Sequence, residues 1–98
     1  MGVKLGFLAT LEAKPGKGNE LAEFLRAGRE LAVAEQGTVT WYAFQVGEDR
    51  YGIFDTFETD GARTAHINGP IAQALGKIAG DLLASEPVIQ PLDVIAVK

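Results

Sequence analysis

The chain contains no cysteine, and this absence excludes several kinds of site. Without thiols there can be no disulfide bond, no thiolate metal ligand and no cysteine nucleophile, and the absence fits a reducing compartment. Histidine is nearly absent too, because His66 is the only one. One imidazole among scattered carboxylates lacks the ligand spacing of a zinc or iron site. Since the dinucleotide-binding, haem-attachment and Ser-His-Asp patterns are also missing, we expect no metal and no cofactor.

Long hydrophobic runs and clusters of basic residues are missing as well. No apolar segment reaches membrane-spanning length, and the N-terminal residues do not resemble a cleaved signal. The formal net charge of −4 argues against nucleic acid or an anionic membrane as a partner. The expectation is a soluble cytoplasmic protein with no nucleic-acid or membrane partner.

The residues that are present indicate one small globular domain spanning residues 1–98. Apolar residues make up 47% of the chain, an ordinary fraction for a folded protein. Alternating and β-branched segments predict strands, and apolar residues at helical spacing predict helices. The strands are expected at residues 3–12, 38–46, 50–58 and 88–98, and the helices at residues 19–36, 59–68 and 70–85.

Local signals refine the expected ends of these elements. Asn19 is a candidate N-cap for the first helix, and Gly37 is its expected left-handed C-cap. Thr59 or Asp60 should cap the second helix, which the Gly69-Pro70 pair interrupts. Residues 94–97 give the last strand its clearest strand pattern.

The order β-α-β-β-α-β predicts a ferredoxin-like α+β fold, an antiparallel sheet with both helices on one face. The expected strands nevertheless carry apolar residues on both sides. Trp41 opposes Tyr42 and Phe44, and Ile53 opposes Phe54. A face left to water would be polar, so we expect a second copy of the chain to cover it in a homodimer.

Four short motifs, in order, resemble the antibiotic biosynthesis monooxygenase (ABM) domain family. They are the segment 13–17, an aromatic-rich second strand after a glycine, the strand end 55–58, and the segment 65–70. The resemblance covers roughly residues 3–97. It implies a dimeric α+β barrel with a pocket between helices and sheet. Some members of the family oxidise phenols or quinols with O₂ and no cofactor, whereas others degrade haem, act as isomerases or have no known activity. The chain departs from many members in carrying Asp55 and Phe57 where those have Glu and Trp.

His66 is the first candidate for chemistry, because histidine alone has an unperturbed pKa near neutrality. It could act as a base or hydrogen-bond donor, or it could simply fix a turn. Asp55 is unusual in an otherwise apolar strand face, and it could orient His66, act as a base, or pair with an arginine or a backbone amide. Trp41 and Phe57 are candidate pocket walls, and Asn68 could polarise a substrate oxygen or cap a helix.

Two functions remain open at the level of the sequence. The first is a cofactor-independent monooxygenase that acts on a small, flat, apolar phenol or quinol, using His66 and Asp55 and binding the substrate with Trp41, Phe57 and Asn68. The second is a non-catalytic small-molecule-binding or structural homodimer of the same fold. Fold and family resemblance do not by themselves decide between the two functions.

Overall fold

A computed structural model describes residues 2–98, which form four strands and three helices in the expected order. The strands are β1 (Leu5–Glu12), β2 (Thr38–Gln45), β3 (Arg50–Phe57) and β4 (Val88–Asp93), and the helices are α1 (Gly18–Ala34), α2 (Asp60–Ile67) and α3 (Pro70–Leu82). No helix within residues 2–98 combines the length and the hydropathy needed to cross a bilayer.

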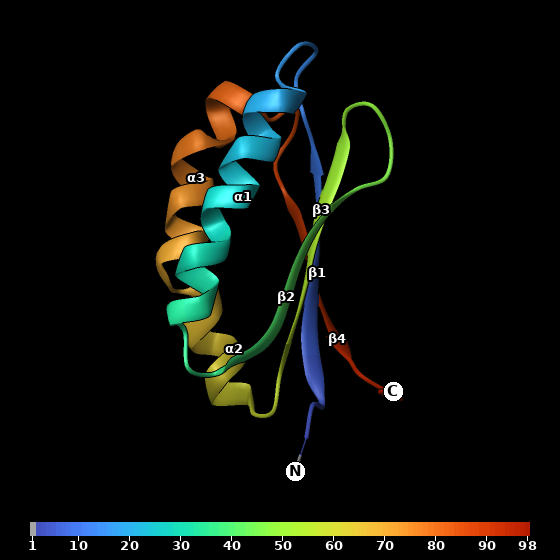
Figure 1. The fold of residues 1–98 in the computed structure, drawn as a ribbon, viewed down its shortest axis with the longest axis vertical. Helices are drawn as coiled ribbons and strands as arrows, with labels where there is room; N and C mark the ends of the chain where they lie inside the picture. Colours follow the sequence, from blue (N-terminus) through green and yellow to red (C-terminus); the bar gives the residue numbers. More distant parts are fainter. Residues whose placement is uncertain (1) are drawn as a thin grey trace.

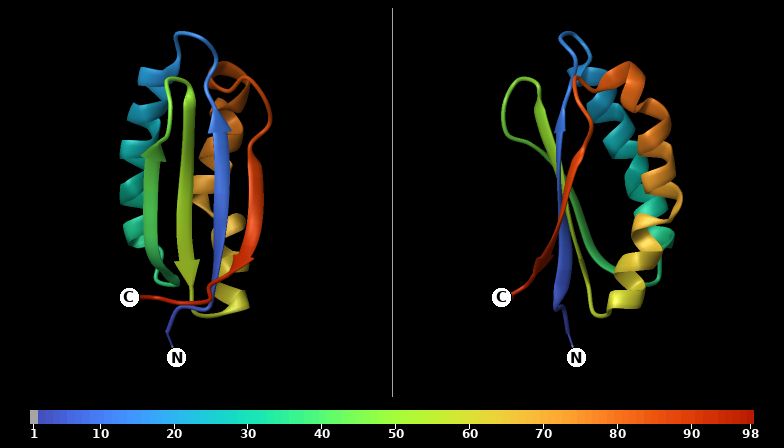
Figure 2. Two further views of the ribbon diagram at one scale, coloured as in Figure 1. Left: turned by 90° about the vertical axis from the view of Figure 1, so that its right-hand side faces the viewer. Right: turned by 180° about the vertical axis from the view of Figure 1, so that it is seen from behind.

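The strands form one antiparallel sheet in the order β2-β3-β1-β4. All three helices lie on one face of it (Figure 1), and within residues 2–98 no helix covers the opposite face, which we call the bare face (Figure 2, left). The ferredoxin-like α+β fold predicted from the sequence is therefore confirmed. The two long helices α1 and α3 pack side by side, and α2 lies below them at the end of the sheet where β3 finishes.

The hydrophobic core fills the space between the helices and the sheet. Leu11 and Ile53 on the sheet meet Leu21 and Leu25 of α1 and Leu75 of α3, and each of these side chains is at most 5% exposed. The strand register continues this inward face along the sheet, so that Phe7, Asp55 and Trp41 lie in one row across β1, β3 and β2. A carboxylate is thus built into the helix-covered face, among apolar neighbours.

Two expected helix caps were wrong. Helix α1 starts at Gly18, with Lys17 at the N-cap position and no side-chain cap, so Asn19 lies inside the helix. Gly37 does not have a left-handed backbone, since the only positive-φ glycines are Gly2 and Gly16 within residues 2–98. A close approach accounts for glycine at this position, because a β-carbon on Gly37 would lie 2.7 Å from that of Ala62 in α2.

The cap of α2 and the break after it are confirmed. The Thr59 side chain accepts a hydrogen bond from the backbone N–H of Ala62, and Pro70 occupies the first turn of α3. Because Pro70 disfavours helical angles at the residue before it, α2 ends near Asn68 and a new helix begins.

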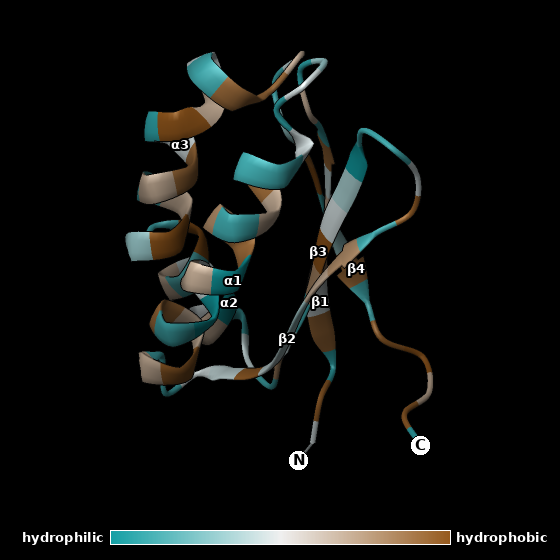
Figure 3. Cartoon of the chain, turned by 45° about the horizontal axis from the view of Figure 1, so that its top comes forward, coloured by the Kyte–Doolittle hydropathy of each residue, from teal (hydrophilic) through white to brown (hydrophobic). Residues whose placement is uncertain are grey.

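The final strand is shorter than expected. Strand β4 ends at Asp93, opposite the start of β1 at Leu5, so the strong β pattern of residues 94–97 lies outside it. Beyond Asp93 the backbone N–H of Val94 still donates to the Lys4 carbonyl at 2.8 Å, and within residues 2–98 no strand is assigned after it. The tail leaves the sheet on the side away from the helices (Figure 2, right) and is largely hydrophobic (Figure 3), with Ile95 98% exposed.

Candidate functional site

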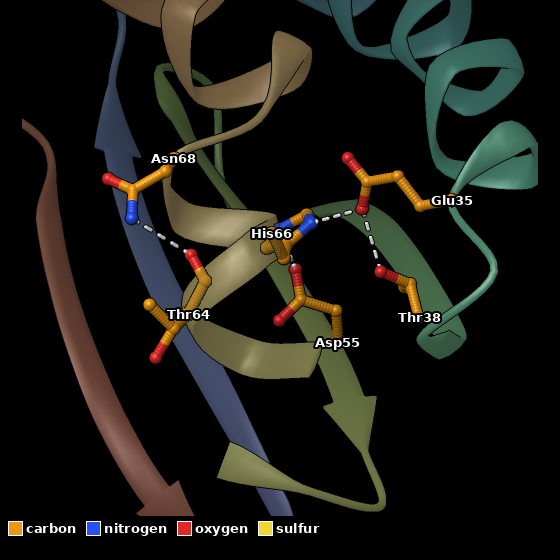
Figure 4. Close-up of polar contacts among 6 residues, drawn as sticks. All are labelled: Glu35, Thr38, Asp55, Thr64, His66 and Asn68. Carbon is orange, nitrogen blue, oxygen red and sulfur yellow. Dashed lines mark hydrogen bonds and ion pairs between the residues drawn. The ribbon is translucent and has the colours of Figure 1, made fainter. Parts of the chain in front are cut away.

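The most unusual polar feature of the interior is a cluster of three ionisable side chains from three separate elements. His66 Nδ1 lies 2.6 Å from Glu35 Oε1, and His66 Nε2 lies 2.8 Å from Asp55 Oδ2 (Figure 4). Thr38 donates its hydroxyl to the same Glu35 oxygen at 2.7 Å. The imidazole therefore bridges two carboxylates, one at the end of α1 and one on β3.

Each side chain is placed by the local structure. Asp55 points inward because alternation along β3 puts it on the face of Ile53 and Phe57. His66 lies in the last turn of α2, where the helix dipole favours a cation. Glu35 is the C-cap residue of α1, and its backbone is already extended, which lets the carboxylate turn toward α2.

The glycine that separates α2 from α3 makes room for Glu35. A β-carbon on Gly69 would lie 3.2 Å from Glu35 Oε2 and 3.1 Å from the Ala65 carbonyl oxygen, tighter than most real contacts. The same Gly-Pro break that ends α2 thus also admits the carboxylate.

Aromatic rings enclose the imidazole on its remaining sides. The ring centroids of Phe57 and Phe7 lie 5.2 Å and 6.4 Å from that of His66, and the two phenylalanines meet edge to face. The Arg63 guanidinium lies over the outer ring, Phe7, at 5.5 Å from its centroid. The cluster is therefore buried: the side chain of Asp55 is 2% exposed, that of His66 8% and that of Glu35 17%.

The surroundings of His66 act on its pKa in opposite directions. Burial alone lowers the pKa of the imidazole, but the hydrogen bonds and negative charges of Asp55 and Glu35 outweigh it and raise the pKa above the ordinary value of 6.5. In its protonated form, which the raised pKa favours, the ring donates one N–H to each carboxylate. Both ring nitrogens of protonated His66 then donate hydrogen bonds, so the ring has no free lone pair with which to act as a base.

Two carboxylate oxygens of the cluster keep unused hydrogen-bonding capacity. Within residues 2–98, Asp55 Oδ1 and Glu35 Oε2 are buried and have no hydrogen-bond partner. Buried acceptors are nearly always satisfied in folded proteins, and exceptions mark strain or function. A cluster of one imidazolium and two carboxylates with two free oxygens can accept a proton and return it.

Of the residues proposed from the sequence, the structure brings His66, Asp55 and Phe57 together. Phe57 packs on the imidazole and is fully buried. Asn68 is exposed, and its side-chain amide donates to the Thr64 carbonyl at 3.1 Å, which is the capping contact considered as its alternative role.

Trp41 lies apart from the cluster's hydrogen bonds and lines a cavity of about 450 Å³ between α1 and β2. Three further aromatic residues are among those that line this cavity; the strand register puts Tyr51 on the same face of the sheet as Trp41, and puts Tyr42 and Phe44 of the edge strand β2 on the opposite face. A neighbouring hollow of about 320 Å³ is lined by Trp41, Thr38 and Thr40. Thr38 therefore connects this hollow to Glu35 of the cluster.

Sequence reasoning missed Glu35. A negative charge at a helix C-terminus opposes the helix dipole, and this unfavourable placement was the available signal. The sequence could not show that His66 is the partner of Glu35, because the two residues are 31 positions apart.

The search for known relatives found solved structures. A protein of unknown function from Nitrosomonas europaea is 44% identical, with 98% of this chain and 93% of that chain covered and a TM-score of 0.96. A Pseudomonas aeruginosa protein is 26% identical over 98% of both chains, with a TM-score of 0.82. A Caulobacter crescentus protein provisionally named an antibiotic biosynthesis monooxygenase is 24% identical over 96% of this chain and 92% of that chain, with a TM-score of 0.80.

The chain belongs to the family of the Nitrosomonas protein and has the ABM fold. No family model and no curated protein matches it. Two further proteins with the same provisional name, from Nitrosomonas europaea and Chloroflexus aurantiacus, share the ABM fold at TM-scores of 0.82 and 0.75. The resemblance seen in the sequence is thus confirmed for the fold.

Proposed function

We propose that this ABM-fold protein is a cofactor-independent monooxygenase that oxidises a small aromatic quinol or phenol. The buried Glu35–His66–Asp55 cluster carries the proposal. Placing two carboxylates and an ionisable imidazole in the interior costs desolvation energy, and such clusters concentrate at sites of proton transfer. The provisional names of proteins with the same fold support the class of reaction.

The reaction balances without an additional oxidant. A hydroquinone and O₂ give a hydroxyquinone and water: a carbon–oxygen bond forms on the ring, the O–O bond breaks, and the ring supplies the four electrons that reduce O₂. Loss of the phenolic proton makes the ring electron-rich enough to react with O₂. The protein therefore has to accept one proton, exclude water from the aromatic ring, and return the proton to the departing oxygen.

The cavity against Trp41 is the proposed place of the aromatic ring, and Thr38 is the proposed entry point for its proton. The Thr38 hydroxyl lines the adjoining hollow and donates to Glu35, which in turn accepts from His66. A proton taken up on this side can be shared through His66 with Asp55. His66 and Asp55 are the proposed catalytic pair, and Glu35 connects them to the substrate side.

Oxygen consumption with a panel of hydroquinones, naphthols and anthrones tests this function. We expect turnover by the wild type and at least a hundredfold slower turnover by Asp55→Asn and His66→Gln, about the contribution of one acid–base group. Thr56→Val is the matched control, because it removes a buried hydrogen bond to Thr40 beside Asp55 and leaves the cluster intact. Full turnover by both cluster variants would refute the assignment.

A second function has one observation in its favour: neither Asp55 nor His66 is among the residues that line the 450 Å³ cavity. In a binding protein without catalysis, the cluster would hold α1, α2 and β3 together and the cavity would hold the ligand. Ligands that raise the melting temperature without consuming O₂, across the whole panel, would establish this function instead.

We further propose that two copies pair through the bare face of the sheet. This face carries Leu8, Tyr42, Phe44, Phe54, Val88 and Leu92, and Tyr42 and Val88 are more than half exposed. Sedimentation equilibrium should give about twice the chain mass of 10.4 kDa. The double change Tyr42→Glu with Val88→Glu should yield monomers, whereas Val33→Glu on α1 should not. A wild-type monomer at micromolar concentration would refute the pairing.

A further inference from the structure

We propose that the cavity between α1 and β2 takes an aromatic acid of one or two rings, and that Arg26 and Arg29 bind its carboxylate. This inference rests on the proposed function only in taking that cavity as the ligand site. It adds the chemical class of the ligand and two residues that select for it.

Arg26 and Arg29 line the cavity together with two apolar residues of α1. Ala22, Leu25, Arg26 and Arg29 are spaced so that they share one face of α1, and all four line the cavity opposite β2. Leu25 belongs to the core cluster together with Tyr51 of the sheet, and Ala22 and Trp41 pack against this cluster, whereas the two arginines are exposed. Each arginine side chain is 69% exposed. The cavity therefore has an apolar inner part and a cationic mouth.

The positive charge at the mouth of the cavity is unusual in a protein with a negative net charge. The chain has a net charge of −4, yet two of its nine basic residues line this one cavity. Their present partners are the exposed carboxylates of Glu23 and Glu30 on the same helix. Exposed pairs of this kind contribute little energy, so a ligand carboxylate can replace them. The planar guanidinium fork suits a carboxylate in particular, since it can donate two parallel hydrogen bonds.

The second, independent observation is the indole of Trp41. Its Nε1 is buried and has no hydrogen-bond partner within residues 2–98, and the side chain lines the same cavity. A buried donor without an acceptor is rare in folded proteins, and an oxygen atom of a ligand would supply the acceptor. The indole packs against α1 at Gly28, where a β-carbon would lie 3.6 Å from the nearest indole carbon, an ordinary contact distance. The residues that line the cavity thus include an indole whose buried N–H has no partner within residues 2–98 and two arginines.

These features define the class of ligand. A volume of about 450 Å³ is at the small end of ligand pockets, which suits one or two fused rings. The ring would lie on the aromatic wall, a hydroxyl or carbonyl oxygen would reach the indole N–H, and the carboxylate would meet the arginines. A hydroxylated aromatic acid combines this shape with the electron-rich ring that the proposed oxidation needs.

Trp41 is the only tryptophan of the chain, so its fluorescence reports on this cavity directly. The experiment titrates naphthoate and its neutral analogue naphthamide into the protein under nitrogen, with Trp41 quenching and calorimetry as readouts. Wild-type protein should bind the acid about tenfold more tightly than the amide, as expected for two exposed charge-assisted contacts. In the variant with Arg26→Ala and Arg29→Ala this preference should disappear, while the affinity for naphthamide stays within about twofold.

The matched control carries Arg50→Ala and Lys77→Ala, which remove the same charge from exposed positions that are not among the residues lining this cavity. It should keep the preference for the acid. Absence of naphthoate binding, equal affinity for acid and amide, or an equal loss in the control variant would each overturn the inference. Because no turnover is measured, a failure of the proposed oxidation in the oxygen assay leaves this result standing, and the two failures are distinguishable.

Discussion

Replacing His66 with glutamine should lower the free energy of unfolding by about 3 kcal/mol at neutral pH. Removing one member of a buried ion pair costs about 3–5 kcal/mol, because the remaining charge is left buried without its partner. Here the residue left behind is mainly Asp55, whose side chain is 2% exposed. The lower end of the range applies because Glu35 is 17% exposed and a glutamine amide can still donate one hydrogen bond.

The pH dependence gives this prediction a second, independent readout. The pKa of His66 is raised in the folded protein because Asp55 and Glu35 outweigh the effect of burial. The stability from the cluster is therefore fully present below the ordinary histidine pKa of 6.5 and is lost as pH rises through the raised, folded value. The wild type should lose stability over that window, and His66→Gln should show no such loss there.

Urea unfolding at a series of pH values between about 5 and about 9 measures both effects. For a domain of this size, about 3 kcal/mol corresponds to a midpoint lower by about 2 M urea. Thr56→Val should cost about 1 kcal/mol for its lost hydrogen bond and keep the wild-type pH profile. Urea midpoints for His66→Gln that match the wild type at every pH would show that the Glu35–His66–Asp55 cluster does not stabilise the fold.

Three further predictions concern the packing of the fold. Gly76→Ala and Gly80→Ala should each raise the stability by about 0.5–1 kcal/mol, seen as a higher melting temperature, because a β-carbon at either helical position has open space around it. Gly6→Ala should lower the stability by about 2 kcal/mol or more in urea unfolding, because its β-carbon would lie 2.5 Å from the backbone oxygen of Asp55. Thr59→Ala should cost about 1 kcal/mol by calorimetry, because α2 loses its N-cap. A neutral Gly6→Ala or a destabilising Gly76→Ala would contradict the packing described here.

Local patterns in the sequence were sufficient for the order of the elements and for most of their ends. Alternation put Asp55 on an apolar strand face, and the Gly69-Pro70 break placed His66 at the end of a short helix. These are short-range properties of propensity, periodicity and proline geometry. They also carried the resemblance to the ABM family, which the solved structures confirm for the fold.

Only the tertiary structure decided what these residues do together. The end of α1 turns Glu35 toward α2, and this makes His66 a bridge between two carboxylates rather than a lone titrating ring. The same holds for residues 94–97, which have a strong strand pattern but lie outside the strands of the described residues 2–98. Pairing, burial and charge coupling act between residues far apart in the sequence, and no local pattern encodes them. The composition shows that the chain has a single histidine, and only the tertiary structure shows that Glu35 and Asp55 are its partners.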